Sequence, residues 1–149
     1  RAPTMKINQL SLFLENKPGH LNAICRTLAA AQINIVTLSL ADTQQFGIVR
    51  LIVEEWQKAK AVLEQAGYVV NVREVVAAAV PDKPGGMAEI LDVVGQAGVN
   101  IEYMYAFAFR HGAEAVLVFR FDNPDRAIEA LKTAGHDVLD AVTLFTEAK

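Results

Sequence analysis

Along this chain, segments rich in β-forming residues alternate with segments in which apolar residues recur every three or four positions. This alternation divides the chain into short strands and helices. Residues 7–14 are rich in β-forming side chains and end at a Pro-Gly breaker. Apolar side chains then recur every three or four residues, which places them on one face of a helix. The first half is expected to contain a strand at 7–14, a helix with the apolar face Leu21, Ile24, Cys25 and Leu28, strands at 36–40 and 48–53 around a turn with Gly47, a helix with Ala59, Val62, Leu63 and Ala66, and a strand at 68–72.

The second half repeats this order of periods. Gly98 is a stop signal for its first helix. Asn123 followed by Pro124 is typical of an N-cap and the first helical position of a second helix. The apolar faces expected for these two helices are Met87, Ile90, Leu91 and Val94, and Ile128 with Leu131.

Short motifs recur in the same order in both halves. The first two are shifted by 66 residues (83 − 17 and 100 − 34) and the third by 68 (134 − 66), which predicts two extra residues near 110–112. Such a repeat indicates two copies of one unit. We therefore predict an α+β fold of two tandem ferredoxin-like βαββαβ modules with antiparallel sheets. The motifs are Lys-Pro-Gly at 17–19 and 83–85, Asn-Ile at 34–35 and 100–101, and Ala-Gly at 66–67 and 134–135.

The two modules are expected to join without a flexible linker. When the copies are aligned, the last strand of the first and the first strand of the second overlap. We therefore expect modules at residues 5–72 and 73–149, with a strand shared or continuous across about 69–80.

Composition narrows the class of protein. Of the 149 residues, 52% are hydrophobic and 21% are charged, and the formal net charge is −3. The chain lacks the basic patch that supplies most of the affinity for nucleic acid. Its single cysteine, Cys25, excludes an internal disulfide and a cysteine-based metal cluster. No apolar run is long enough for a membrane span, and residues 1–4 before Met5 lack the apolar core of a signal peptide, so a cytoplasmic protein is expected.

The Pro-Gly segments at 15–21 and 81–87 each connect a strand to the start of a helix. Unpaired N–H groups and the positive end of the dipole attract a carboxylate to a helix start. Glycine lets these amides approach a ligand closely, and proline keeps the loop ordered. Two interpretations are open: a plain sharp turn, or a site for the α-carboxylate of an amino acid. Because both copies keep the motif at the same position, we favour binding.

These residues also carry a family resemblance. The pattern Asn or Asp, Lys-Pro-Gly, any residue, Leu or Met, followed by Asn-Ile fifteen residues after the glycine (34 − 19), resembles the ACT domain over residues 7–145. The resemblance implies a non-catalytic sensor of amino acids, with ligands near the first loop at an interface between paired modules. The resemblance implies site positions at Asn16 and Asn34 in the first copy and at Asp82 and Asn100 in the second. The other candidate ligand-binding residues come from the two loops and the strand at 101–109. They are Lys17, Pro18, Gly19, His20 and Leu21 in the first copy, and Lys83, Gly85, Gly86, Met87 and Tyr103 in the second.

Asparagine suits such a ligand because its amide both donates and accepts, whereas an ionised Asp82 would favour an ammonium group. In serine-sensing ACT domains the ligand is held by two asparagines, to which Asn16 and Asn34 correspond, and by a histidine. That histidine position is Leu14 here and Val80 in the second copy, so serine specificity is not implied. As an alternative, Asn34 and Asn100 could each serve a left-handed turn.

The copies differ along the strand after the first helix. The second copy has aromatic side chains at alternating positions, which fill a core or interface or line a site. The first copy has small side chains there. We therefore expect two non-equivalent sites. The two sets are Tyr103, Tyr105, Phe107 and Phe109 in the second copy, and Thr37, Ser39 and Ala41 in the first.

Other functions remain as alternatives. No nucleophile elbow, phosphate loop or metal-ligand spacing is present, so no catalysis and no cofactor are predicted. RNA-recognition modules share the element order, but residues 46–50 poorly match their aromatic strand motif. The chain could instead be a protein-protein interaction or oligomerisation module without a ligand. Modules this small bury little surface alone, so we expect a homodimer that acts on a metabolic enzyme or regulator in trans.

Overall fold

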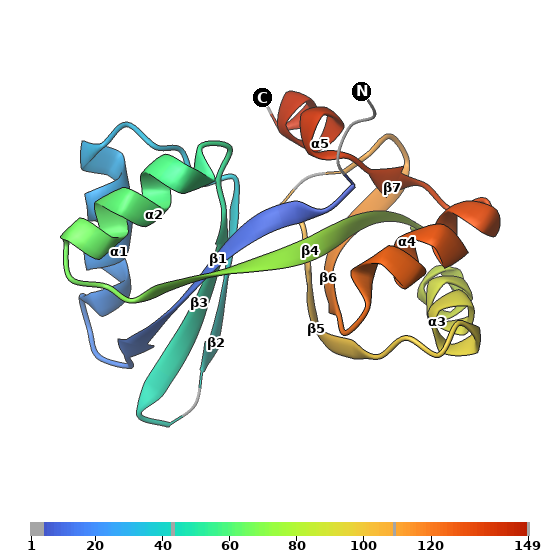
Figure 1. The fold of residues 1–149 in the computed structure, drawn as a ribbon, viewed down its shortest axis with the longest axis horizontal. Helices are drawn as coiled ribbons and strands as arrows, with labels where there is room; N and C mark the ends of the chain where they lie inside the picture. The colour runs from blue at the N-terminus through green and yellow to red at the C-terminus, as the bar shows by residue number, and fades with distance from the viewer. Residues whose placement is uncertain (1–4, 43, 109, 149) are drawn as a thin grey trace. The chain divides into compact units, whose positions relative to one another are not determined.

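A computed structural model describes residues 5–42, 44–108 and 110–148 (Figure 1). The chain divides into two compact units. The first contains Asn8–Arg73, and the second contains the chain from Glu74 onward together with the described residues before Asn8. No helix in the described ranges is long and apolar enough to cross a membrane.

The first unit has helices on one face of an antiparallel sheet, in the strand order β2-β3-β1-β4. Glu15 at the end of β1 pairs with Phe46 at the start of β3. Thr37 at the start of β2 pairs with Ile52 at the end of β3. Its elements are β1 (Ile7–Glu15), α1 (His20–Ala30), β2 (Thr37–Asp42), β3 (Phe46–Ile52), α2 (Trp56–Gln65) and the beginning of β4 (Val70–Pro81).

Alternation along β1 places Leu10, Leu12 and Leu14 on the helix-covered face, where they join the core. Ile24 of α1 and Leu63 of α2 are fully buried against the same core. Burying each such side chain contributes about 1.5–3 kcal/mol. The side chains that the strand and helix periods predicted to be apolar therefore form the core between this sheet and its helices.

The second unit has the same arrangement. β4 pairs with β6 on one side and with β7 on the other, and β5 lies at the outer edge against β6. The α+β, ferredoxin-like fold predicted from the sequence is confirmed. The elements after β4 are α3 (Gly86–Gln96), β5 (Ile101–Ala106), β6 (Glu114–Phe121), α4 (Pro124–Thr133), β7 (Val138–Leu139) and α5 (Ala141–Glu147).

The strand registers make the repeat explicit. Leu10 pairs with Leu51 in the first sheet, and Val76 pairs with Phe119 in the second. The shifts are 66 (76 − 10) and 68 (119 − 51). In the β5–β6 pairing, Met104 takes the place of Leu38, still a shift of 66 (104 − 38). The two extra residues therefore lie between β5 and β6, as the motifs predicted. The predicted N-cap is also confirmed, because the Asn123 side chain accepts a hydrogen bond from the Arg126 amide at 3.2 Å.

Two features of the second unit were not predicted. The last strand, β7, has only two residues, because the Asp140 side chain caps a further helix by accepting from the Thr143 amide at 2.7 Å. Leu144 of this helix is fully buried. The predicted apolar face of α3 was also wrong at Leu91, which is 39% exposed, because the core lies beneath Ile90 and Val94.

An ion-paired histidine connects α5 to the hairpin between β5 and β6. The Nδ1 of His111 lies 2.7 Å from the Glu147 carboxylate, and its Nε2 lies 2.9 Å from Asp137. Both ring nitrogens can donate only when the imidazole is protonated. The hydrogen bond to Glu147, opposed by partial burial and supported by both negative charges, raises the pKa of His111 above its ordinary value of 6.5.

This cluster predicts a pH-dependent stability. Because the folded pKa is raised, the stabilisation is complete below pH 6.5 and is lost as the pH rises through the folded pKa. We expect His111→Ala to lower the free energy of unfolding by about 0.5–1.5 kcal/mol near pH 6 and by much less near pH 9. Thermal unfolding of both proteins at the two pH values measures this, and a pH-independent difference would contradict it.

Candidate functional site

The strand-to-helix loop of the first unit is a tight exposed turn. The Asn16 amide donates to the Gln45 carbonyl at 2.9 Å, and the His20 amide donates to the Lys17 carbonyl at 3.2 Å. Gly19 has a φ of 86°, a left-handed conformation that favours glycine. Pro18 is exposed, and Leu21 packs against the core below. Gly19 therefore forms the sharp turn between β1 and α1.

The Glu15 carboxylate stands at the start of this loop, 2.9 Å from the Lys17 ammonium. The hydrogen bond from Lys17, its charge and the nearby His20 hold the pKa of Glu15 below its usual value. The carboxylate is therefore ionised at neutral pH. The loop thus presents an anionic group beside the positive end of the α1 dipole.

The equivalent loop of the second unit has the same backbone but different surroundings. Gly85 has a φ of 85°, and the Gly86 amide donates to the Lys83 carbonyl at 3.0 Å. Gly86 is buried, and a Cβ there would overlap the carbonyl of Pro81. The Asp82 carboxylate, predicted as an ammonium ligand, lies 2.7 Å from the Arg110 guanidinium. Met87 packs against the core.

A cavity of about 490 Å³ opens beside the first loop. Among the predicted site residues, His20 lines it, while Asn16, Lys17, Pro18 and Gly19 lie in the adjoining turn. The aromatic walls of this cavity were not predicted from the sequence. Phe13 is out of phase with its buried β1 neighbours, and this alternation was the available signal. The lining residues are Phe13, Leu14, Glu15, His20, Ala23, Phe46 and Tyr68.

The structure does not bring Asn16 and Asn34 together within the first unit. Asn16 follows the end of β1, beside the start of β3, whereas Asn34 precedes β2, whose start pairs with the end of β3. The two lie at opposite ends of this seven-residue strand, about 20 Å apart at 3.3 Å per residue.

The left-handed role considered for the asparagines was wrong. The residues with positive φ lie two positions earlier, Gln32 at 59° and Gly98 at 71°. Asn34 is exposed. Asn100 is held through its backbone, whose amide donates to the Asp122 carboxylate at 2.9 Å.

Tyr103 lies on the sheet face opposite the helices α3 and α4. It is paired across the strands with Arg120, whose neighbour Phe119 faces the core. Tyr103 and Tyr105 are half-buried and Phe107 is buried, whereas Phe109 lies outside the described residues. The role of this aromatic stripe, as packing or as the wall of a site, stays a prediction.

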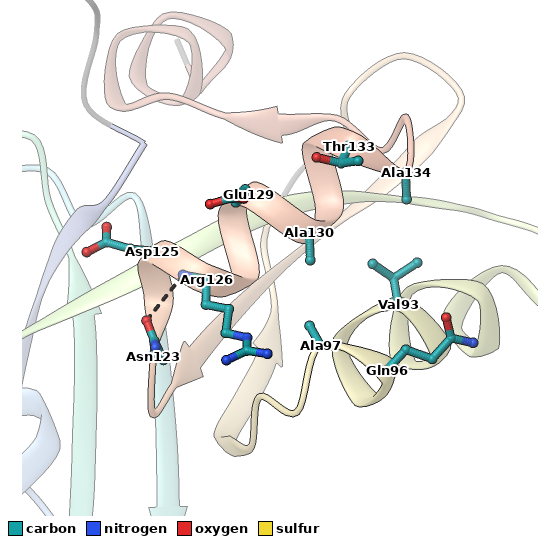
Figure 2. Close-up of a pocket in the computed structure, with 10 residues that line it drawn as sticks. All are labelled: Val93, Gln96, Ala97, Asn123, Asp125, Arg126, Glu129, Ala130, Thr133 and Ala134. Carbon is teal, nitrogen blue, oxygen red and sulfur yellow. Dashed lines mark hydrogen bonds between the residues drawn. The ribbon is translucent and has the colours of Figure 1, made fainter.

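A second hollow, of about 830 Å³, lies between α3 and α4 (Figure 2). Figure 2 shows the Arg126 side chain extending from α4 toward Ala97 at the end of α3. The hollow contains none of the predicted site residues. Its lining consists of Val93, Gln96, Ala97, Asn123, Asp125, Arg126, Glu129, Ala130, Thr133 and Ala134. Within residues 5–42, 44–108 and 110–148, no group of histidine, cysteine and acidic residues is arranged to hold a metal ion.

Comparison with known proteins supplies the family context. The model of a family described as an ACT domain pair matches residues 5–147. Protein BT0572 from Bacteroides thetaiotaomicron is 40% identical, with 95% of this chain and 96% of that chain covered and a TM-score of 0.87. The regulatory subunits of aspartate kinase from Thermus thermophilus and Thermus flavus are each 18% identical, with TM-scores of 0.66 and 0.61. They cover 90% and 89% of this chain, and 96% and 95% of their own. No curated protein matches the chain.

Proposed function

The chain belongs to the family of ACT domain pairs, and from this membership we propose that it is a non-catalytic sensor that binds an amino acid and acts on a partner in trans. The proposed modules are residues 5–72 and 73–149. The proposed ligand groups are the two Lys-Pro-Gly loops, with Asn16 and Asp82 at their starts. The proposed partner is a metabolic enzyme or regulator.

The observation that carries this proposal is the duplicated loop geometry. Both loops turn into a helix through a left-handed glycine, and a Cβ at either glycine would meet open space. Helices α1 and α3, like α2, begin without a side-chain cap, whereas Asn123 and Asp140 cap α4 and α5. The first-turn amides of α1 and α3 therefore suit the carboxylate of an amino acid.

The structural relatives support a regulatory role. Two of them are regulatory subunits of aspartate kinase, one described in a ligand-free form. Because Asn16 and Asn34 lie at opposite ends of one sheet, a ligand that contacts both would need a loop from one module and an asparagine from another. This favours the proposed homodimer with sites at module interfaces.

Thermal unfolding in the presence of each of the twenty amino acids tests the proposal. A ligand at 100 times its Kd stabilises the folded protein by about 2.7 kcal/mol, which raises the Tm by several degrees. We expect a selective shift that Asn16→Ala abolishes. Gln57→Ala, on the exposed side of α2, is the matched control and should keep the shift.

The competing function is a ligand-free interaction module, which exposed apolar side chains favour. Phe13 is 64% exposed and Phe46 is 51% exposed, and Leu38 and Leu40 on the edge strand β2 are also exposed. Exposed apolar patches commonly mark interaction sites. A Tm unchanged by all twenty amino acids would favour this function over the sensor.

A further inference from the structure

The cavity beside the first loop has walls that suit a large apolar group. Three aromatic residues contribute, Phe13 from β1, Phe46 from β3 and Tyr68 from the segment before β4. Phe13 and Phe46 leave more than half of their surface in solvent. An apolar ligand group that covers these rings would gain about 25 cal/mol for each Å² removed from water. The volume of about 490 Å³ falls within the usual range for small-molecule sites.

The polar groups at this cavity complement a zwitterion. The ionised Glu15 carboxylate lines it, and the acceptor positions that its pairing with Lys17 leaves can take hydrogen bonds from the ammonium group of a ligand. The start of α1 lies beside it, and the Leu21 and Asn22 amides have no hydrogen-bond partner among the described residues. The first turn of α1 contains no acidic residue that would repel a carboxylate. An anionic group, the start of a helix and apolar walls therefore meet at one cavity.

The second unit lacks this combination at the equivalent positions. The registers align Glu15 with Pro81 and Phe46 with Glu114. The residue equivalent to His20 is Gly86 (20 + 66), where a Cβ would overlap the Pro81 carbonyl. In the second unit, a proline thus takes the place of the anionic Glu15, and a glutamate takes the place of the aromatic Phe46.

The position of Tyr68 is taken by His136 in the second unit. The Tyr68 amide donates to the Leu63 carbonyl, and the His136 amide donates to the Leu131 carbonyl, both 68 residues further on (136 − 68 and 131 − 63). The Asp82 carboxylate of the second loop is paired with Arg110, as Glu15 of the first is paired with Lys17. The second loop therefore keeps the backbone turn of the first and carries a histidine in place of the tyrosine wall.

We propose that the first unit alone binds the ligand, and that this ligand is an α-amino acid with a large apolar side chain. The side chain lies against Phe13, Phe46 and Tyr68, the ammonium group meets Glu15, and the carboxylate meets the start of α1. The inference rests on the proposed amino-acid sensor and adds the side-chain class and the number of sites.

Isothermal titration of the full chain tests it with L-phenylalanine, L-leucine, L-serine, L-lysine and L-aspartate. We expect L-phenylalanine or L-leucine to bind at one site per chain, at least tenfold more tightly than the other three. Phenylpropionate, without the ammonium group, and phenethylamine, without the carboxylate, should each bind at least tenfold more weakly than L-phenylalanine.

Phe46→Glu, which introduces the residue of the second unit, should raise the Kd at least tenfold, because it removes an aromatic wall and places a charge against the apolar side chain of the ligand. Phe46 is exposed, so the Tm without ligand should stay close to that of the parent. Glu114→Ala is the matched control at the equivalent position and should keep the Kd.

The outcomes separate the two proposals. Binding of only small or charged amino acids, two equal sites per chain, or a Kd unaffected by Phe46→Glu would overturn the inference and leave the sensor function standing. Binding of none of the twenty amino acids would overturn the sensor function itself.

Discussion

Replacing Phe119 by alanine should lower the free energy of unfolding of the second unit by about 3–5 kcal/mol. Phe119 lies on β6, is fully buried, and is among the largest side chains of this core. Its ring stacks on Phe121, with centroids 5.2 Å apart and an interplanar angle of 8°. The substitution removes this contact and leaves a cavity that the sheet and helices cannot close.

Urea denaturation followed by circular dichroism measures this loss. Phe13→Ala is the control, because Phe13 is 64% exposed and its removal should change stability by less than about 0.5 kcal/mol. Similar losses for both variants would mean that the Phe119 ring is not a central support of the second core.

Gly86→Ala should also destabilise the chain strongly, by about 2–4 kcal/mol. A Cβ at this position would overlap the carbonyl oxygen of Pro81, a backbone atom that also accepts the Lys83 amide at 2.9 Å. Neither group can move without displacing the start of α3 or the end of β4. The penalty therefore comes from close backbone approach rather than from backbone dihedral angles.

Gly95→Ala, within the same helix, is the matched control for Gly86→Ala. A Cβ at Gly95 would meet nothing within 4 Å, and alanine is favoured over glycine in a helix by about 1 kcal/mol. Opposite signs of the two stability changes in urea denaturation are expected. A stabilising Gly86→Ala would show that the second loop is open enough to hold a side chain, as the first loop holds His20.

The fold was accessible from local patterns in the chain. Periods of two and of three to four residues predicted the strands and helices, because the side-chain directions of each element repeat with those periods. The repeated Lys-Pro-Gly and Asn-Ile motifs predicted the duplication, and the registers of β1 and β4 confirm it. Asn123 predicted a helix start because an N-cap depends on residues within one turn.

The surroundings of each loop could not be predicted in this way, because they depend on residues distant in the chain. Glu15 and Phe46 are neighbours only through the pairing of β1 with β3, and Asp82 meets Arg110 only through the pairing of β4 with β6. His111 reaches Glu147 through the packing of α5, a short helix whose weak local signal was missed.

The two loops illustrate the division between local and tertiary information. Their shared motif determined the same left-handed glycine and the same helix start, since both are local properties of the backbone. Tertiary packing decided that the first loop borders an aromatic cavity. It also decided that the second loop leaves no room for a Cβ at Gly86 beside the Pro81 carbonyl. It also placed Asn16 and Asn34 at opposite ends of one sheet, because helix α1 carries the chain back along the sheet between two parallel strands before the second asparagine is reached.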